Sequence, residues 1–344
     1  MKKNIKLIGL LLVIISILIG CSSTQNVDNT NSEKNTDTET DKPEKVTIQI
    51  DGAAVPYYAP LYIAKEKGYF EEEGLNVEFL YAAAADIVKN VAVGNVQFGF
   101  PNADSVITAK SQNIPVKVVH TTYQSGLGAT IFKKDKGINS PSDLKGKTIA
   151  VTNYGSPNYI QLQVMLKQHG LSIDDVDIEI VGTGAIVNSL VVDQVDAITF
   201  STLRTVELKK QGVLVDEFLS DEYLPSHGNV LVTSDEYLTT NEVQVKGFIN
   251  ALNKGMQYII DGNVDEAIDV SIKKHATSFE GKEETVKDIL NNVFIPSLWQ
   301  SDLTKDKGLG AADLERWQKT IDILYEYKMI DNKIKADDFI VNLN

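Results

Sequence analysis

Strands and helices alternate along most of this chain, and the alternation starts twice. An apolar strand at 46–50 leads through a Gly-Ala-Ala loop to a short helix that begins near Pro60. Proline suits the first turn of a helix because the N–H that it lacks would have no partner there. The rhythm restarts after Ser140, which is expected to cap a single turn before a strand at 148–151. Such alternation predicts an α/β fold with mostly parallel sheets covered by helices on both faces.

The C-terminal third of the chain is almost entirely helical, with apolar residues at the spacing typical of core packing. We expect these helices to cover the first lobe, which we place at 45–132 plus 229–344. The second lobe is then 133–228. Strands at 129–132 and 230–233 would cross between the lobes, and two crossings allow a hinge beside a cleft.

The first residues are typical of a secretory signal. Three lysines precede an apolar run at 7–19, which is too short to span a membrane comfortably. The run ends in Gly20-Cys21, and small residues before a cysteine resemble the lipobox of bacterial lipoproteins. In that family the cysteine becomes the first mature residue and carries a diacylglyceryl group. We therefore expect a signal peptide at 1–20, a lipid anchor at Cys21 and an extracytoplasmic location on the cytoplasmic membrane, with an uncleaved membrane anchor as the alternative.

The next segment is polar almost throughout, and the whole chain is acidic. Residues 22–45 cannot bury enough apolar surface to offset the entropy of ordering, so we expect a flexible tether at 21–44. Loss of the three signal lysines takes the formal charge from −14 to −17. Such a charge argues against nucleic acid as a partner. Cys21 is the only cysteine, so no disulfide can form within the chain.

Several motifs resemble one branch of the substrate-binding proteins of ABC importers. That branch holds binders of thiamine-precursor pyrimidines, riboflavin, aliphatic sulfonates, taurine and nitrate. The motifs are APLYIAKEKGYF at 59–70 with GLNV at 74–77, GNVQFG at 94–99, SPSDLKGKT at 140–148 and VDQVDAI at 192–198. In the motif GNVQFG, Gln97 stands where the family usually has aspartate. The resemblance covers roughly 45–265.

The resemblance implies a two-lobe periplasmic-binding-protein fold of the second type. Such a protein closes on a solute and delivers it to a membrane permease driven by a cytoplasmic ATPase. It implies a monomer without a cofactor or a metal, and no catalytic residues.

Ligands of open α/β sheets bind at the carboxyl ends of strands and the N-termini of helices. Tyrosines there could stack on a planar ring, and helix N-termini offer N–H donors. Of Tyr57 and Tyr58, at the exposed strand–helix junction, one is expected to pack inward, since neighbours on an extended stretch point opposite ways. The candidate ligand-binding residues are Tyr57, Tyr58, Asn102, Asp104, Ser105, Tyr123, Tyr154, Ser156, Ser201, Thr202 and Arg204.

Several of these residues also have a structural interpretation. Ser201, Thr202 and Asp104 could be helix caps, and Arg204 could be a solvated charge on a helix face. We interpret His120 and His227 as structural polar residues. Arg204 is the only arginine near the predicted cleft, and anionic ligands usually recruit arginine. The sequence therefore favours a neutral or weakly charged heteroaromatic nutrient over an aliphatic sulfonate, taurine or nitrate.

Two other classes of protein remain as alternatives. The same fold resembles pyrimidine synthases that use a histidine and a cysteine-rich motif for iron chemistry. Here no cysteine follows Cys21, and the four histidines show no metal-ligand spacing. A surface adhesin would lack the cleft.

Overall fold

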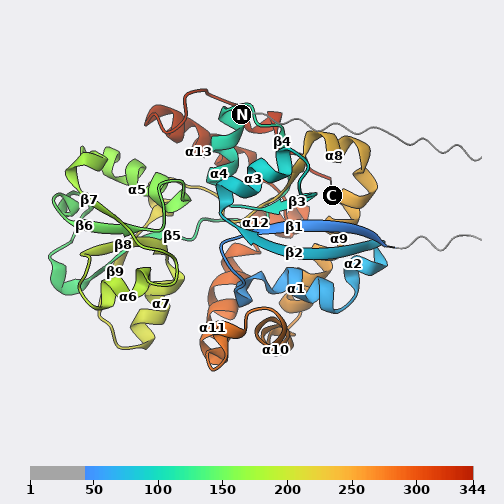
Figure 1. Cartoon of the computed structure of the whole chain (residues 1–344), viewed down its shortest axis with the longest axis horizontal. Coiled ribbons are helices and arrows are strands. Elements are labelled where there is room, and N and C mark those ends of the chain that lie inside the picture. Colours follow the sequence, from blue (N-terminus) through green and yellow to red (C-terminus); the bar gives the residue numbers. More distant parts are fainter. Residues whose placement is uncertain (1–42, 344) are drawn as a thin grey trace, which may run out of the picture. The chain divides into compact units, whose positions relative to one another are not determined.

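The computed structural model describes residues 43–343, and its strands form two mixed five-stranded sheets (Figure 1). The first sheet has the order β2-β1-β3-β10-β4. These strands are β1 (Glu44–Asp51), β2 (Leu75–Ala82), β3 (Phe98–Phe100), β4 (Val116–His120) and β10 (Leu231–Ser234). Strand β1 runs parallel to β2 and β3, whereas β10 runs antiparallel to β3 and β4. We call the region around this sheet lobe 1.

The second sheet, in lobe 2, has the order β7-β6-β8-β5-β9. Its strands are β5 (Gly128–Lys133), β6 (Thr148–Val151), β7 (Asp177–Ile180), β8 (Ala197–Ser201) and β9 (Val215–Leu219). The prediction that 129–132 belongs to the first lobe was wrong. Strand β5 pairs antiparallel with β8 on one side and β9 on the other, which fixes it inside the second sheet. The lobe boundaries thus remain a proposal, with β5 moved to lobe 2.

The helices lie outside these sheets, and those from α8 onward follow the last strand, β10. In lobe 1 they are α1 (Ala59–Glu66), α2 (Tyr69–Glu72), α3 (Ala84–Ala92), α4 (Ala103–Ser111), α8 (Asp235–Thr240), α9 (Glu242–Ile260), α10 (Val264–Lys274), α11 (Glu283–Ile289), α12 (Asp302–Lys307) and α13 (Leu314–Glu326). In lobe 2 they are α5 (Pro157–Gln168), α6 (Ile186–Val191) and α7 (Leu203–Lys210). A π-helical segment, Leu290–Leu298, follows α11 directly.

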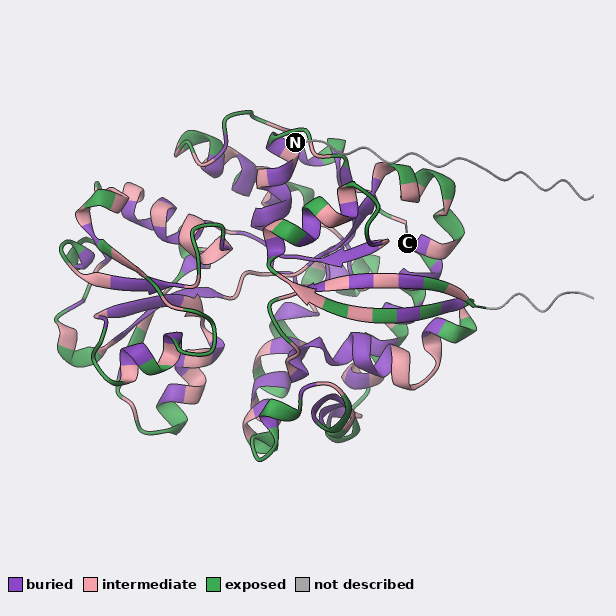
Figure 2. Ribbon diagram, viewed as in Figure 1, coloured by how far each residue is buried: buried purple, intermediate pink, exposed green. Residues whose placement is uncertain are grey.

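Each sheet is covered on both faces, as the alternation of strands and helices predicted. On β1, Val46, Ile48 and Ile50 are fully buried in a core that also holds α1 and α9. Ile87 of α3 and Val232 of β10 belong to a separate core on the other side. Figure 2 shows buried residues concentrated on the strands and on the inner faces of the helices. The predicted α/β architecture is confirmed, with mixed rather than mostly parallel sheets.

Two connections join the sheets, and they pair with each other. The backbone N–H of Tyr123 donates to the carbonyl of Asn229 at 2.9 Å, and that of Gly228 donates to the carbonyl of Tyr123 at 3.2 Å. A Cβ on Gly228 would lie 2.9 Å from the Tyr123 Cβ, closer than real Cβ atoms approach. Glycine is therefore required where the two connections meet.

The predicted signal peptide, lipidated Cys21 and almost all of the tether lie outside the described residues. Within residues 43–343, no helix has the length and apolar character needed to cross a membrane.

Candidate functional site

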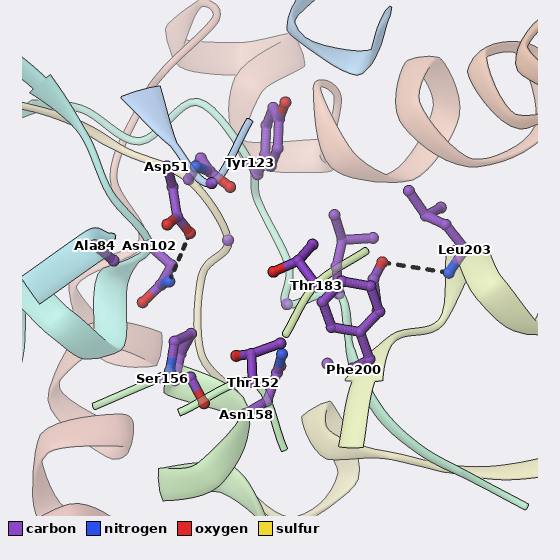
Figure 3. A pocket seen from close by; sticks show the side chains of 18 of the residues that line it. Asp51, Ala84, Asn102, Tyr123, Thr152, Ser156, Asn158, Thr183, Phe200 and Leu203 are labelled. Atoms are coloured by element: carbon purple, nitrogen blue, oxygen red, sulfur yellow. Dashed lines mark hydrogen bonds between the residues drawn. The ribbon is translucent and has the colours of Figure 1, made fainter. Parts of the chain in front are cut away.

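A cavity of about 440 Å³ is lined by residues of both lobes (Figure 3). Its walls include the end of β1 at Asp51, the loop after β6 at Thr152 and the end of β8 at Ser201. This is the edge where parallel strands end and helices begin, which is the usual place for ligands in α/β folds. The volume lies within the range of small-molecule sites.

Asp51 and Asn102 form the polar part of the lobe 1 wall. The side-chain amide of Asn102 donates to the Asp51 carboxylate at 3.4 Å, and its carbonyl oxygen accepts from the Ser105 N–H at 3.2 Å as the cap of α4. Burial raises the pKa of Asp51 to about 6, although the Asn102 hydrogen bond opposes this. Sequence reasoning missed Asp51. Its position as the last residue of an apolar strand was the available signal.

Tyr57, Tyr58 and Tyr123 line the cavity but are largely buried. The Tyr58 hydroxyl donates to the Asp51 carbonyl at 2.7 Å, and the Tyr123 hydroxyl donates to the Tyr57 carbonyl at 3.0 Å. One of Tyr57 and Tyr58 was expected to pack inward, and both are buried. Pro56–Tyr58 is a turn of 3-10 helix rather than an extended stretch, so its neighbouring side chains do not point opposite ways.

Arg204 is already paired at the lobe 2 wall. One guanidinium nitrogen donates to both carboxylate oxygens of Glu207 at 2.7 Å, and the guanidinium lies 5.6 Å from the centre of the Phe200 ring. Only 19% of its side chain is exposed. Because Glu207 neutralises it in place, Arg204 offers little free charge to an anionic ligand.

Two predicted serines line the same wall and also serve helices. The Ser156 hydroxyl accepts from the Tyr159 N–H at 3.2 Å and caps α5. The Ser201 hydroxyl accepts from the Leu203 N–H at 3.3 Å at the start of α7. The structural and the ligand-binding interpretations of these serines therefore coexist.

Four predicted site residues do not line the cavity. Asp104 is fully buried, where it accepts hydrogen bonds from Gln161 and Ser226. Ser105 is buried in the first turn of α4, and Thr202 precedes α7 without a capping hydrogen bond from its side chain. Tyr154 is 62% exposed and packs edge-to-face on Tyr159.

Three further lining residues carried no recognisable signal: Gln161, Phe200 and Phe294. His227, interpreted from the sequence as a structural polar residue, also lines the cavity. Phe294 lies in the π-helical segment, where its carbonyl accepts from the Trp299 N–H at 2.8 Å, and its ring stacks on Tyr57 at 5.1 Å. Segments of π-helix are frequent at functional sites.

Four lining side chains of the described part also carry buried polar atoms without a protein partner. The atoms are the Tyr57 hydroxyl, Oε1 of Gln161, Nε of Arg204 and Nε2 of His227. Nδ1 of His227 faces the Gln124 carbonyl at 3.0 Å, so Nδ1 is the donor and Nε2 the acceptor of a neutral ring. Burial, helped by Arg316, lowers the pKa of His227 to about 4. Buried polar atoms of this kind call for a ligand or a water. Within residues 43–343, no three histidine, cysteine or carboxylate side chains are placed to hold a metal ion.

Comparison with known families identifies the family of this chain. The model of the family described as NMT1/THI5 like matches residues 55–265, which include most of the cavity wall. The chain belongs to the NMT1/THI5-like family. The resemblance drawn from the motifs at 59–70 and 140–148 is thereby confirmed.

NMT1/THI5-like relatives carry the names of both binding proteins and enzymes. Riboflavin-binding protein RibY of Chloroflexus aurantiacus is 27% identical over 306 residues, 87% of this chain and 85% of its own. The formylaminopyrimidine-binding protein of Halalkalibacterium halodurans is 27% identical over 349 residues, 98% of each chain. A 4-amino-5-hydroxymethyl-2-methylpyrimidine phosphate synthase of Aspergillus parasiticus is also 27% identical, over 232 residues that cover 63% of this chain and 67% of the synthase.

Solved structures share the fold. The periplasmic aliphatic sulphonate-binding protein of Escherichia coli superimposes with a TM-score of 0.67 at 16% identity, covering 88% of this chain and 94% of its own. At that identity the likeness shows the fold alone. The predicted periplasmic-binding-protein fold is confirmed.

Proposed function

We propose that this protein is an extracytoplasmic solute-binding protein that captures a heteroaromatic nutrient between its lobes and delivers it to an ABC permease. The ligand is a thiamine-precursor pyrimidine or a flavin. The observation that supports this best is the cavity wall, which combines aromatic rings with a half-buried carboxyl at Asp51 and an arginine already neutralised by Glu207. Relatives named as riboflavin-binding and formylaminopyrimidine-binding proteins, each covered over most of its length, support the same class.

The delivery step and the location follow from the same proposal. A lipid at Cys21 would hold the lobes at the outer face of the membrane, where they can reach a permease with its ATPase on the other side. The acting unit is then a monomer that carries one ligand.

Ligand binding is tested by thermal unfolding of the purified protein with candidate ligands, since binding to the folded state raises the melting temperature. The candidates are 4-amino-5-hydroxymethyl-2-methylpyrimidine, riboflavin, taurine and nitrate. We expect saturable stabilisation by at least one ring compound and none by taurine or nitrate. Stabilisation by the anions alone would instead support the sulfonate or nitrate class.

The enzyme alternative is favoured by the synthases among the relatives. Its test is incubation of the protein with iron and the substrates of pyrimidine synthesis, followed by mass spectrometry. We expect no turnover and no stoichiometric iron. Detection of either one would replace the transport role with a catalytic one.

A further inference from the structure

We propose that Asp51 selects the ligand, and that the ligand is an aminopyrimidine-type base that presents an amino group beside a ring nitrogen. This inference rests on the proposed function and narrows its ligand class. Asp51 is the only carboxylic acid side chain that lines the cavity among the described residues. Its side chain contacts Asn102 at 3.4 Å, near the outer limit of a hydrogen bond, so a ligand donor could compete for it (Figure 3).

The carboxyl of Asp51 is available in both protonation states near neutral pH. Burial raises its pKa to about 6, while Asn102 and the backbone N–H groups of Ala84 and Gly52 lower it. The protonated carboxyl carries a donor beside an acceptor, and the carboxylate carries two acceptors. An aminopyrimidine matches both patterns.

In the first state, the Asp51 O–H donates to the ring nitrogen and the other oxygen accepts from the amino group. In the second state, the ring nitrogen holds the proton and the carboxylate accepts both N–H groups. The two states contain the same atoms and the same number of protons. The pair therefore keeps two hydrogen bonds wherever the proton lies.

Other candidate ligands match Asp51 less well. The pyrimidine edge of a flavin places one N–H between two carbonyls, so it pairs fully with the protonated carboxyl only, and with the carboxylate a carbonyl oxygen would face a carboxylate oxygen. A sulfonate or nitrate would bring a negative charge toward a buried carboxyl, and like charges in such a site exclude the wrong ligand.

The other groups on the cavity wall do not titrate in the same range as Asp51, and Asp104, whose pKa is also raised to about 6, does not line the cavity. The Tyr58 hydroxyl donates to the Asp51 carbonyl, and burial keeps its pKa well above the ordinary value. Elsewhere on the wall, Arg204 is paired with Glu207, and His227 is neutral because its pKa is lowered to about 4. Asn102, at the start of α4, carries no charge. Asp51 is thus the group whose proton the ligand can share.

The test is isothermal titration calorimetry with 4-amino-5-hydroxymethyl-2-methylpyrimidine. Asp51→Leu removes donor and acceptor, and we expect affinity to fall at least about tenfold. Asp51→Asn supplies a donor beside an acceptor without a charge, so affinity should stay within about threefold of wild type. The matched control is Asp86→Leu, at an exposed position of α3 outside the cavity, which should leave affinity unchanged.

The pH profile separates ligand contact from a structural role. In the wild-type complex, Asp51 and the ring nitrogen of the ligand share one proton. Above about pH 6 binding must take this proton up from solution, so affinity should weaken as pH rises to about 8.5, by up to tenfold per pH unit. Asp51→Asn needs no such proton, and its affinity should be flat over that range. This comparison remains informative if Asp51→Leu does not fold.

Three outcomes overturn the inference. If wild type binds the aminopyrimidine and Asp51→Leu binds it equally well, Asp51 is not the selecting residue, although the proposed function stands. Tighter binding of riboflavin than of the aminopyrimidine would reject the ligand class in the same way. Binding of no ring compound by the wild type would reject both the inference and the proposed function.

Discussion

Asp104 shows how a single buried carboxyl can join the two lobes. It lies in the first turn of α4 and accepts from Nε2 of Gln161, on α5 of lobe 2, at 2.7 Å. The Ser226 hydroxyl, in the connection between the sheets, donates to its other oxygen. Burial raises the pKa of Asp104 to about 6, although both hydrogen bonds lower it.

We expect Asp104→Asn to raise the free energy of unfolding at neutral pH. A carboxyl whose pKa is raised in the folded state contributes its full stability below about pH 4, and loses it as pH rises through about 6. Asparagine does not titrate and can keep both partners. The variant should therefore gain roughly 1–2 kcal/mol over wild type above pH 6 and little at pH 4.

Urea unfolding at both pH values measures this difference. Asp86→Asn, on an exposed residue, is the control and should show no pH-dependent gap. A gap that shrinks as pH rises would contradict the assignment to Asp104.

For single residues, the sequence predicted the position at a strand end or a helix start better than the direction of the side chain. Ser156 and Ser201 lie on the cavity because strand ends and helix starts can be read from local patterns. Tyr154 is exposed and Asp104 is buried because their surroundings come from distant segments. No local pattern contains that information.

Helix α9 approaches α1 so closely that one of its residues must be glycine. A Cβ on Gly255 would lie 2.2 Å from the carbonyl oxygen of Pro60 and 3.3 Å from the Ala64 Cβ. A backbone oxygen cannot turn aside as a long side chain can. The helix pair that supports the Pro56–Tyr58 turn therefore depends on this contact.

We expect Gly255→Ala to destabilise the protein by roughly 1–3 kcal/mol, because overpacking forces the backbones apart. Gly247, on the same helix, is the matched control. Its Cβ would meet the Glu73 Cβ at 3.1 Å, which a small shift can relieve, and alanine favours a helix over glycine. Chemical denaturation of both variants should separate them, and equal stability would contradict the close approach of α9 to α1.

Most elements begin and end close to where the sequence placed them, since apolar periodicity and caps are local signals. Strand β6 covers Thr148–Val151, as the sequence indicated. Strand β5 was assigned to the wrong sheet because its partners β8 and β9 lie far along the chain. The π-helical segment with Phe294 had no local signature at all.

An exposed ion pair bridges the lobes beside the cavity. Lys210 of α7 contacts Asp288 of α11 at 2.7 Å, with both side chains about two-fifths exposed. Such pairs contribute roughly 0–1 kcal/mol. We therefore expect the Lys210–Asp288 pair to affect the approach of the two lobes more than the stability of either lobe.

We expect Asp288→Asn to weaken ligand binding by up to about fivefold, because the closed form loses a contact that the open form does not make. Asp265→Asn is the control, since Asp265 pairs with Lys287 at 2.6 Å within lobe 1. Calorimetry at low and high salt should show the difference shrinking with salt. An equal effect of both variants would contradict a role for the Lys210–Asp288 pair in closure.

The topology also fixes the order in which the sheets can be completed during synthesis. Every strand of the second sheet lies between residues 128 and 219, so that sheet is whole once this segment has emerged. In the first sheet, β4 has β10 as its neighbouring strand, and β10 emerges later still. An unpaired strand edge invites association with other chains. The second sheet is therefore complete before the first. The chain is most prone to aggregation in the interval when β4 has been synthesised and its partner β10 has not.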